Sequence, residues 1–230
     1  MKITFKEDSH QYFDENGVEY QSVTKMLHNY SQPFDKYKMS ELVARKRGIT
    51  QTEVLAEWDA ANKHACDYGT AVHLLMENYI KKREMVEGNE SLYESFDAIL
   101  KEYLPTHTEI LSEIILWDKE TRVAGTSDLV FELPNDEFVV GDFKTNKALN
   151  YFSKYNSYLK YPVEHLTDCN YSIYCLQLSI YALMRERITG KKCRNVFLLY
   201  RVGDEWKYIP ADYMKYEAMA VLKHWKLQGA

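Results

Sequence analysis

Three residues of this sequence have the types and spacing that suit chemistry: Asp128, Asp142 and Lys144, all within AGTSDLVFELPNDEFVVGDFKTNK. Asp142 and Lys144 end a predicted strand in which alternate side chains share a face, so the acid and the amine should point the same way. A turn signal, LPND at residues 133–136, predicts a hairpin that folds the Asp128 carboxylate back beside Asp142. Two facing carboxylates repel unless a cation lies between them, so the segment predicts a cation site.

The chemistry that fits this set is metal-dependent cleavage of a phosphodiester. Mg²⁺ takes one or two carboxylates, keeps several waters and shares a substrate phosphate, and Mn²⁺ is a second candidate. Lys144 would position the attacking water or stabilise charge that develops on the phosphoryl oxygens. The alternative is that Asp128 caps a bend, Asp142 ends a strand and Lys144 pairs with them on a solvated face. The apolar run FVVG before Asp142 is typical of a strand buried on both faces, which favours the site.

A further acid, Glu113, lies in the segment ILSEIILW at residues 110–117. Apolar residues at both parities predict a central strand. A carboxylate in the middle of such a strand is costly unless it meets a cation, which a metal or Lys144 would supply. The alternative is a glutamate at a solvated strand edge.

These residues and two further stretches resemble the PD-(D/E)XK nuclease superfamily. The half-sites are Ser127-Asp128, with serine where the family has proline, and Asp142-Phe143-Lys144 followed by Thr145. Tyr68 to His73 is similar to the Gly-x-x-x-His motif that the RecB-type exonuclease branch carries near the start of a helix. Gln177 to Tyr181 is similar to that branch's Gln-x-x-x-Tyr motif. The matches stand in the family's order.

The resemblance implies an α/β fold with a restriction-endonuclease-like core, in which a central mixed sheet is flanked by helices and preceded by an N-terminal helical region. It implies that His73 and the Phe143 carbonyl join Asp128 and Asp142 as metal ligands. It also supports the placement of Glu113 in the catalytic site. Gln177 and Tyr181 would steady the catalytic groups or the substrate. Read from the residues alone, His73 is equally a packed or capping imidazole, and Gln177 and Tyr181 are a polar notch and a core position.

The function implied is that of a metal-dependent DNA nuclease, an exonuclease acting in recombination, repair or phage DNA processing. Two alternatives stay open: a structure-selective or restriction-like endonuclease on the same core, and a non-catalytic nucleic-acid-binding protein on a degenerate nuclease fold.

Lysines and tyrosines alternate in the segment that follows the catalytic lysine. Residues 144–163 contain four lysines and no acid, although the whole chain carries a net charge of −5. Lysines suit phosphates and tyrosine rings stack on bases, so this lysine–tyrosine loop (residues 145–163) is expected to bind DNA that is single-stranded or has a free end. A solvated loop with aromatics packed inward is the alternative. The expected contacts are Lys147, Tyr151, Lys154, Tyr155, Tyr158 and Lys160.

Periodicity and turn signals predict one nuclease domain over residues 1–230, made of an N-terminal hairpin and helical region (1–103), a catalytic core (104–210) and a C-terminal helix (211–230). The helical region should break near residues 31–33, near Gly48 and between residues 81 and 94. The core should follow the order helix, three strands, helix, strand, a prediction made from periodicity apart from the motifs. Its strands are expected at 109–117, 123–133, 137–144, 195–202 and 206–209, and its later helices at 171–187 and 212–227.

Composition excludes several classes. No apolar run approaches a membrane span and the first residues lack the apolar core of a secretion signal, so we expect a cytoplasmic protein of a bacterium or a phage-infected cell, with no membrane partner. The four cysteines, Cys66, Cys169, Cys175 and Cys193, lack the tight C-terminal group that holds an iron–sulfur cluster in some RecB-type nucleases, so free, mostly buried thiols are expected. The sequence has no P-loop, so any motor would be a separate helicase or recombination partner, and a homo-oligomer is a further expectation.

Overall fold

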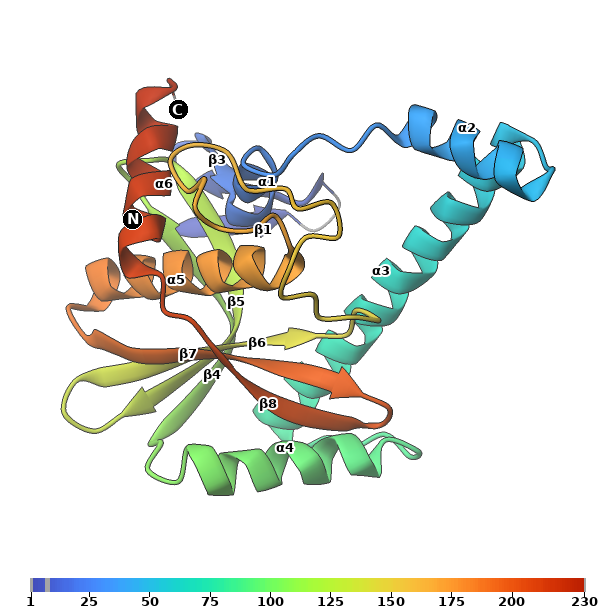
Figure 1. Cartoon of the computed structure of the whole chain (residues 1–230). Coiled ribbons are helices and arrows are strands. Elements are labelled where there is room, and N and C mark those ends of the chain that lie inside the picture. Colours follow the sequence, from blue (N-terminus) through green and yellow to red (C-terminus); the bar gives the residue numbers. More distant parts are fainter. Residues whose placement is uncertain (1, 7–8, 230) are drawn as a thin grey trace.

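A mixed eight-stranded sheet with helices on both faces forms the centre of the protein, as the computed structural model shows (Figure 1). The structure describes residues 2–6 and 9–229. The strands are β1 (Ile3–Lys6), β2 (Gln11–Asp14), β3 (Glu19–Ser22), β4 (Glu109–Asp118), β5 (Val123–Leu133), β6 (Glu137–Lys144), β7 (Lys192–Val202) and β8 (Glu205–Ala211). The helices are α1 (Val23–His28), α2 (Lys36–Arg47), α3 (Gln51–Lys82), α4 (Glu90–Tyr103), α5 (Asn170–Thr189) and α6 (Lys215–Leu227).

Strand β5 is the strand on which the sheet is organised. The sheet order is β1-β2-β3-β5-β6-β7-β8, and β4 pairs with β5 along the other edge. Two strands therefore share one edge of β5: β3 pairs in parallel at Val123 and Ala124, and β6 pairs antiparallel from Leu129 to Leu133. The four residues between these ladders, 125–128, form no ladder on that edge.

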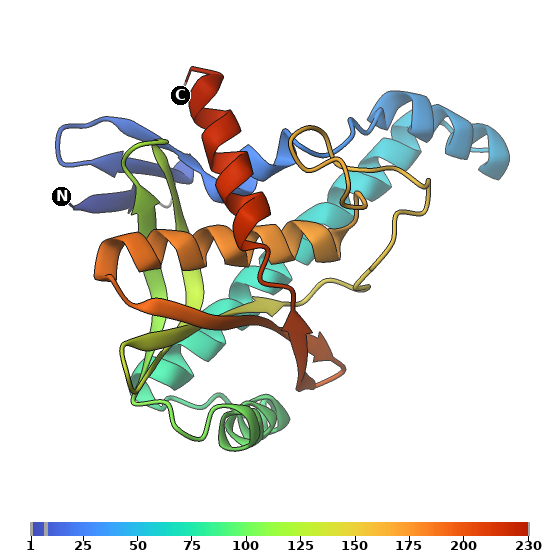
Figure 2. The ribbon, with the colours of Figure 1, turned by 60° about the vertical axis from the view of Figure 1, so that its left-hand side comes forward.

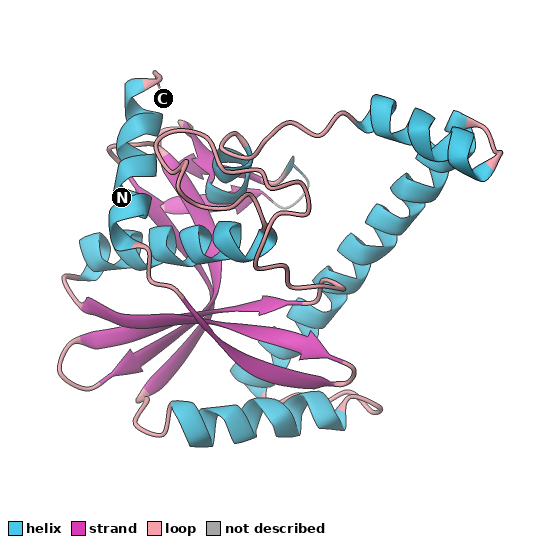
Figure 3. Ribbon diagram, in the orientation of Figure 1, coloured by secondary structure: helices cyan, strands magenta, loops and turns pink. Residues whose placement is uncertain are grey.

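Side chains alternate between two packed layers, as the strand period requires. Val130 and Val140 join a core with α1, α5 and α6, whereas Leu129 and Val139 join a core with α3 and α4. Figures 2 and 3 show α5 crossing one face of the sheet and α4 lying against the other. The N-terminal strands add a third, smaller core around Tyr12, Tyr20 and Ala124.

The alternation is interrupted at one rung of the β4–β5 ladder. Ser112 pairs with Leu129 and Ile114 with Ser127, so Glu113 stands opposite Asp128, and Glu113 has a φ of 54°. Leu111, before this rung, and Ile114, after it, both pack in the α5 layer. The residues of β4 that face α5 therefore change from odd-numbered to even-numbered at this rung. A non-glycine residue with positive φ inside a strand is strained, and such strain clusters at functional sites.

Helix α3 is the longest helix, and its start is fixed by a reciprocal cap. The Thr50 side chain accepts from the Glu53 amide while the Glu53 carboxylate accepts from Thr50, and Gly48 ends α2 with a φ of 68°. Ion pairs join α2 to α3, for example Arg47 with Glu57. Together α2 and the first half of α3 form a helical hairpin, the arm (residues 36–66), that projects from the rest of the molecule (Figures 1 and 2).

The predicted fold class is confirmed, and so are the helix and strand order and the breaks in the helical region. The predicted N-terminal hairpin is instead three strands, with a turn at Glu15 to Gly17 between β2 and β3, while residues 7 and 8 lie outside the described part. The single nuclease domain and its internal division stay predictions.

The prediction that Glu113 lies in a central strand is wrong. Within the described residues β4 pairs with β5 alone, so β4 is an edge strand. It is apolar at both parities because both of its faces are covered: Leu116 packs towards α5, while Ile115 and Trp117 pack against the N-terminal strands. Among the described residues, no helix combines the length and the apolar composition needed to cross a membrane.

A buried ionic cluster joins β5 to the end of α5. The Glu132 carboxylate accepts from both Arg185 and Lys191, and Glu132 and Arg185 are buried. Burial raises the pKa of Glu132, but the two cations outweigh it, so the pKa lies below the ordinary value. The glutamate is therefore ionised at neutral pH and forms ion pairs with two cations.

We expect Glu132→Gln to lower the free energy of unfolding at pH 7 by about 3 kcal/mol, because it leaves two cations together without their counter-charge. A carboxylate with a lowered folded pKa stabilises above its unfolded pKa of about 4.3 and loses that contribution as pH falls through the folded value. Urea unfolding at pH 7 and at pH 3.5 should therefore show a difference between variant and wild type that shrinks in acid. The exposed Glu205→Gln is the control, and a pH-independent difference would contradict the electrostatic account.

Candidate active site

Asp128 lies where β6 separates from β5. The last ladder pair between these strands is Leu129 with Gly141, and one residue further Oδ2 of Asp128 accepts a hydrogen bond of 2.8 Å from the backbone N–H of Phe143. A carboxylate thus continues the pairing that the backbone ends. The N–H and C=O of one strand residue face the same edge, so the Phe143 carbonyl also faces this opening.

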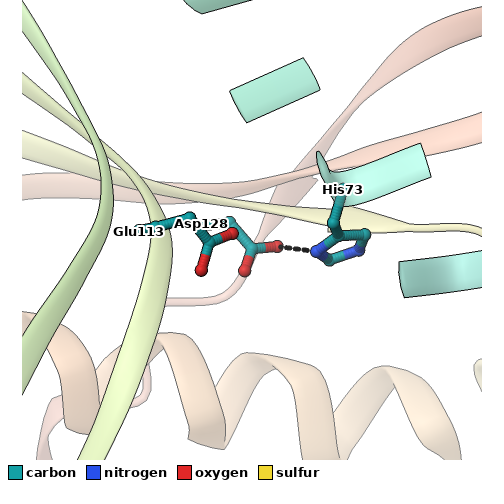
Figure 4. A group of neighbouring side chains, drawn as sticks. All are labelled: His73, Glu113 and Asp128. Atoms are coloured by element: carbon teal, nitrogen blue, oxygen red, sulfur yellow. Dashed lines mark ion pairs between the residues drawn. The ribbon is translucent and has the colours of Figure 1, made fainter. Parts of the chain in front are cut away.

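His73 reaches Asp128 from α3. Its Nδ1 lies 3.4 Å from Oδ2 of Asp128 (Figure 4). The centres of the His73 and Phe143 rings are 5.8 Å apart, in an edge-on arrangement. The expectation that the Gly-x-x-x-His motif stands near a helix start is wrong, because α3 begins at Gln51 and the motif lies in its second half. Gly69 has a packing role there: a Cβ on Gly69 would lie 3.3 Å from Oγ1 of Thr145, so the glycine lets α3 approach the chain that leaves β6.

Glu113 lies beside Asp128 and completes a group of potential metal ligands. One ligand atom from each of His73, Glu113 and Asp128 lies within 4.8 Å of the others (Figure 4). The positive φ of Glu113 belongs to the rung at which the alternation of β4 and β5 is interrupted. The glutamate therefore does not lie at a solvated strand edge, although its strand is at the edge of the sheet.

Asp142 and Lys144 form an ion pair next to this group, as the two-residue spacing predicted. Asp142 is 2% exposed, and its Oδ2 is the oxygen that contacts the Lys144 ammonium. Nζ of Lys144 also lies over the Tyr174 ring of α5, 4.4 Å from the ring centre. Asp142 is thus a buried carboxylate whose charge is paired with the Lys144 ammonium.

The charges of the site shift one another's pKa values. Burial raises the pKa of Asp142 to about 6, helped by the nearby Asp128 charge and opposed by Lys144. Burial and Asp128 likewise raise the pKa of Glu113 to about 7. Asp128 keeps a pKa below its ordinary value because His73, Lys144 and the Phe143 amide outweigh its burial. The three acids, Glu113, Asp128 and Asp142, thus lie near only two cationic groups, His73 and Lys144.

The two bases of the site are held in their charged forms by these acids. Burial lowers the pKa of His73, but the Asp128 carboxylate outweighs it and raises the pKa to about 9. Burial also opposes the charge on Lys144, and Asp142 and Asp128 again outweigh it, so the pKa of the amine is raised. Lys144 is therefore held as an ammonium in this site.

Gln177 and Tyr181 lie on the α5 face next to the opening, and each has a defined contact. Nε2 of Gln177 donates to the Tyr181 hydroxyl at 3.2 Å. Tyr181 packs against the backbone of β5 at Gly125, where a Cβ would come within 2.7 Å of the ring. Gly125 is thus required by the tyrosine, and neither Gln177 nor Tyr181 belongs to the ligand group of His73, Glu113 and Asp128.

Sequence reasoning missed Tyr12, Thr126 and Tyr174. The Tyr12 hydroxyl bonds to Oγ1 of Thr126 at 3.0 Å, on the stretch of β5 that lies between its two ladders. Nothing in the sequence joins β2 to β5, because their contact depends on how β3 pairs. Tyr174 is one turn before Gln177 and Leu178 on α5, so helical spacing from the Gln-x-x-x-Tyr motif was the signal available.

The lysine–tyrosine loop has its aromatic side chains exposed, not packed inward. Phe152 and Tyr155 are 76% and 77% exposed, and Tyr151 and Tyr158 are 46% and 45% exposed. The lysines differ: Lys147 and Lys154 are exposed, whereas Nζ of Lys160 donates to the Asn29 carbonyl at 3.0 Å. The loop thus presents rings and two uncommitted lysines to solvent beside the site, and DNA contact by these residues stays a prediction.

The donors present fit a hard divalent cation. The described group offers two carboxylates and one imidazole, Asp142 adds a buried carboxylate next to it, and the Phe143 carbonyl faces the same opening. The cysteines lie elsewhere and are free: Cys169 and Cys175 are buried, Cys193 is half-buried and Cys66 is exposed on α3.

Comparisons with known proteins give two solved structures that resemble this chain over most of its length. One is SSO0001, 12% identical, with a TM-score of 0.36 and coverage of 91% of this chain and 76% of that one. The other, from Eubacterium rectale, is named "Putative exonuclease"; it is 12% identical, with a TM-score of 0.38 and coverage of 92% and 82%. No family model and no curated protein matches the sequence.

We expect Mn²⁺ to bind more tightly at pH 8 than at pH 6, because the ion must displace protons from His73, Glu113 and Asp142, whose pKa values are raised. Each proton displaced should make the affinity rise about ten-fold per pH unit. Isothermal titration calorimetry in two buffers of different ionisation enthalpy measures both the affinity and the protons released. Asp128→Asn should weaken binding while Glu205→Gln should not, and pH-independent binding would refute the assignment.

Proposed function

We propose that this protein is a metal-dependent nuclease that hydrolyses phosphodiester bonds in DNA. The observation that carries the proposal is the meeting of Asp128, Asp142, Lys144, His73 and Glu113 at the opening between β5 and β6. The residues come from three strands and one helix, and their charges are balanced only in part by one another. Such a set suits a cation and a phosphate better than it suits the packing of a sheet.

Asp128, Glu113 and His73 would hold the cation, with Asp142 and the Phe143 carbonyl at the remaining positions. The carboxylates suit Mg²⁺, and the imidazole nitrogen makes Mn²⁺ an equal candidate. When bound there, the cation would polarise the phosphoryl group and lower the pKa of a water molecule.

Lys144 has the position and the charge to act on the substrate. Its ammonium lies beside Asp142 and over Tyr174, which leaves its charge inside the site and restricts its direction. In that place it would donate to a non-bridging phosphate oxygen or hold the attacking water. Gln177 and Tyr181 would act through packing and hydrogen bonding, because Tyr181 fixes the β5 backbone at Gly125.

The substrate class and the mode of cutting are proposed from the lysine–tyrosine loop and from resemblance. Exposed rings with Lys147 and Lys154 suit a single strand, or a duplex with a free end. The Gly-x-x-x-His and Gln-x-x-x-Tyr motifs resemble the RecB-type exonuclease branch of the PD-(D/E)XK superfamily, which leads us to propose exonuclease activity in recombination, repair or phage DNA processing. A helicase partner and a homo-oligomer would be compatible with that role.

We expect Asp142→Asn and Lys144→Ala each to reduce Mg²⁺- or Mn²⁺-dependent cleavage of end-labelled DNA on the order of 1,000-fold, because each removes a charge from the reacting centre. Circular dichroism should show both variants folded. Lys192→Ala is the matched control, since Lys192 pairs at the opposite end of β6 from Lys144. Full cleavage by a purified Asp142→Asn preparation would refute the proposal.

An exonuclease needs a strand end, so we expect covalently closed single- and double-stranded circles to resist digestion while the same DNA is degraded after linearisation. Product sizing on denaturing gels would show mono- or short oligonucleotides from the linear form. Cutting of closed circles at a comparable rate would replace the exonuclease assignment with an endonuclease, without affecting the assignment of the catalytic residues.

A further inference from the structure

One face of α3 continues past the sheet and lines an open cavity. In its second half, α3 packs on the sheet through Val72, Met76 and Tyr79, which are spaced by three and four residues. The same spacing extended towards the N-terminus reaches Tyr68, Ala65 and Ala61. These residues do not pack on the sheet, and instead line a cavity of about 520 Å³.

The opposite wall of this cavity is the chain that leaves the candidate active site. It consists of Thr145, Asn146 and Lys147, directly after Lys144 in the sequence. Thr145 also approaches α3 at Gly69, one turn before His73, so the inner end of the cavity is next to the site. The volume lies within the range of about 300–1,000 Å³ that small-molecule sites have.

Tyr68 supplies an aromatic surface at the cavity mouth. It is 38% exposed, and the guanidinium of Arg201 lies over its ring, 5.0 Å from the ring centre. Arg201 is itself held by the Gly203 carbonyl and by Asp204, so the cation is fixed against the ring. Tyr68, Thr145, Asn146 and Lys147 also line a second hollow of about 340 Å³ on the Arg201 side, so the ring stands between two spaces.

The charged side chain in the lining of the cavity, Lys147, is a cation. Lys147 is exposed, and Arg201 lies behind the ring. The nearest acids of the same elements are paired: Asp67 with Lys63 on α3, and Asp204 with Arg201. A mainly apolar space lined by an aromatic ring and an exposed lysine matches a nucleobase whose phosphate lies outside.

We propose that the cavity between α3 and residues 145–147 binds a base of a single-stranded DNA substrate next to the phosphate that is cleaved. Tyr68 provides the stacking surface, the alanines leave room for the base, and Lys147 contacts the adjoining phosphate. The proposal rests on the nuclease function proposed above, and it adds the place and the chemistry of nucleotide recognition.

The test measures binding without cleavage, so that it is separate from the catalytic assignment. Anisotropy of a labelled single-stranded oligonucleotide in the presence of Ca²⁺ gives the dissociation constant for wild type, Tyr68→Phe and Tyr68→Ala. We expect Tyr68→Ala to weaken binding about ten-fold, as loss of one base stack does, and Tyr68→Phe to bind like the wild type. Tyr216→Ala, which removes an exposed tyrosine from α6, is the matched control and should have no effect.

A second series replaces single nucleotides of the strand, one at a time, by abasic residues. At one position near the strand end, the abasic strand should bind wild type about ten-fold more weakly than the intact strand does. Wild type and Tyr68→Ala should then have equal dissociation constants for that strand, because the base that Tyr68 contacts is already absent. Equal weakening of Tyr68→Ala on intact and on all abasic strands, or no weakening at all, overturns the proposal. Absence of Mg²⁺-dependent cleavage would instead overturn the nuclease function, since the binding series does not depend on it.

Discussion

The division of one edge of β5 between two partner strands is the constraint on which the site depends. Because β3 pairs only at the start of β5 and β6 only at its end, the middle of that edge has no backbone partner. Polar side chains occupy this region: Oδ2 of Asp128 accepts from the Phe143 amide of β6, and the hydroxyls of Thr126 and Tyr12 bond to each other. A buried backbone N–H without a partner is costly, so Asp128 supports the fold by accepting from the Phe143 amide.

The interrupted rung of Glu113 and Asp128 lies on the other edge of β5, where β4 pairs. A strand that changes which residues face the helices needs one residue in an unusual backbone conformation, and here that residue is Glu113. Burial and repulsion by the Asp128 carboxylate opposite it raise the pKa of Glu113. The sheet thus keeps an electrostatic strain that a bound cation would relieve, a common arrangement where ligand binding and folding are linked.

Much of this was accessible from the sequence because it depends on local periodicity. The bounds of β5 and β6 follow from apolar runs and the turn between them, and the ion pair of Asp142 with Lys144 follows from strand alternation. The edge position of β4 was not accessible, since burial by layers and burial by neighbouring strands give the same apolar pattern. The contact of Tyr12 with Thr126 was not accessible either, because it joins segments whose pairing is set by the whole sheet.

The continuity of α3 ties the length of the chain to the position of His73. Each residue of a helix turns the next by about 100°, so one amino acid inserted between Gly69 and His73 would direct the imidazole away from Asp128. An insertion in the turn between α2 and α3 would instead change only the tip of the arm. The reciprocal cap at Thr50 and Glu53 would still fix the residue at which α3 begins. Variation in chain length is therefore compatible with the tip of the arm and incompatible with the turn of α3 that carries the histidine.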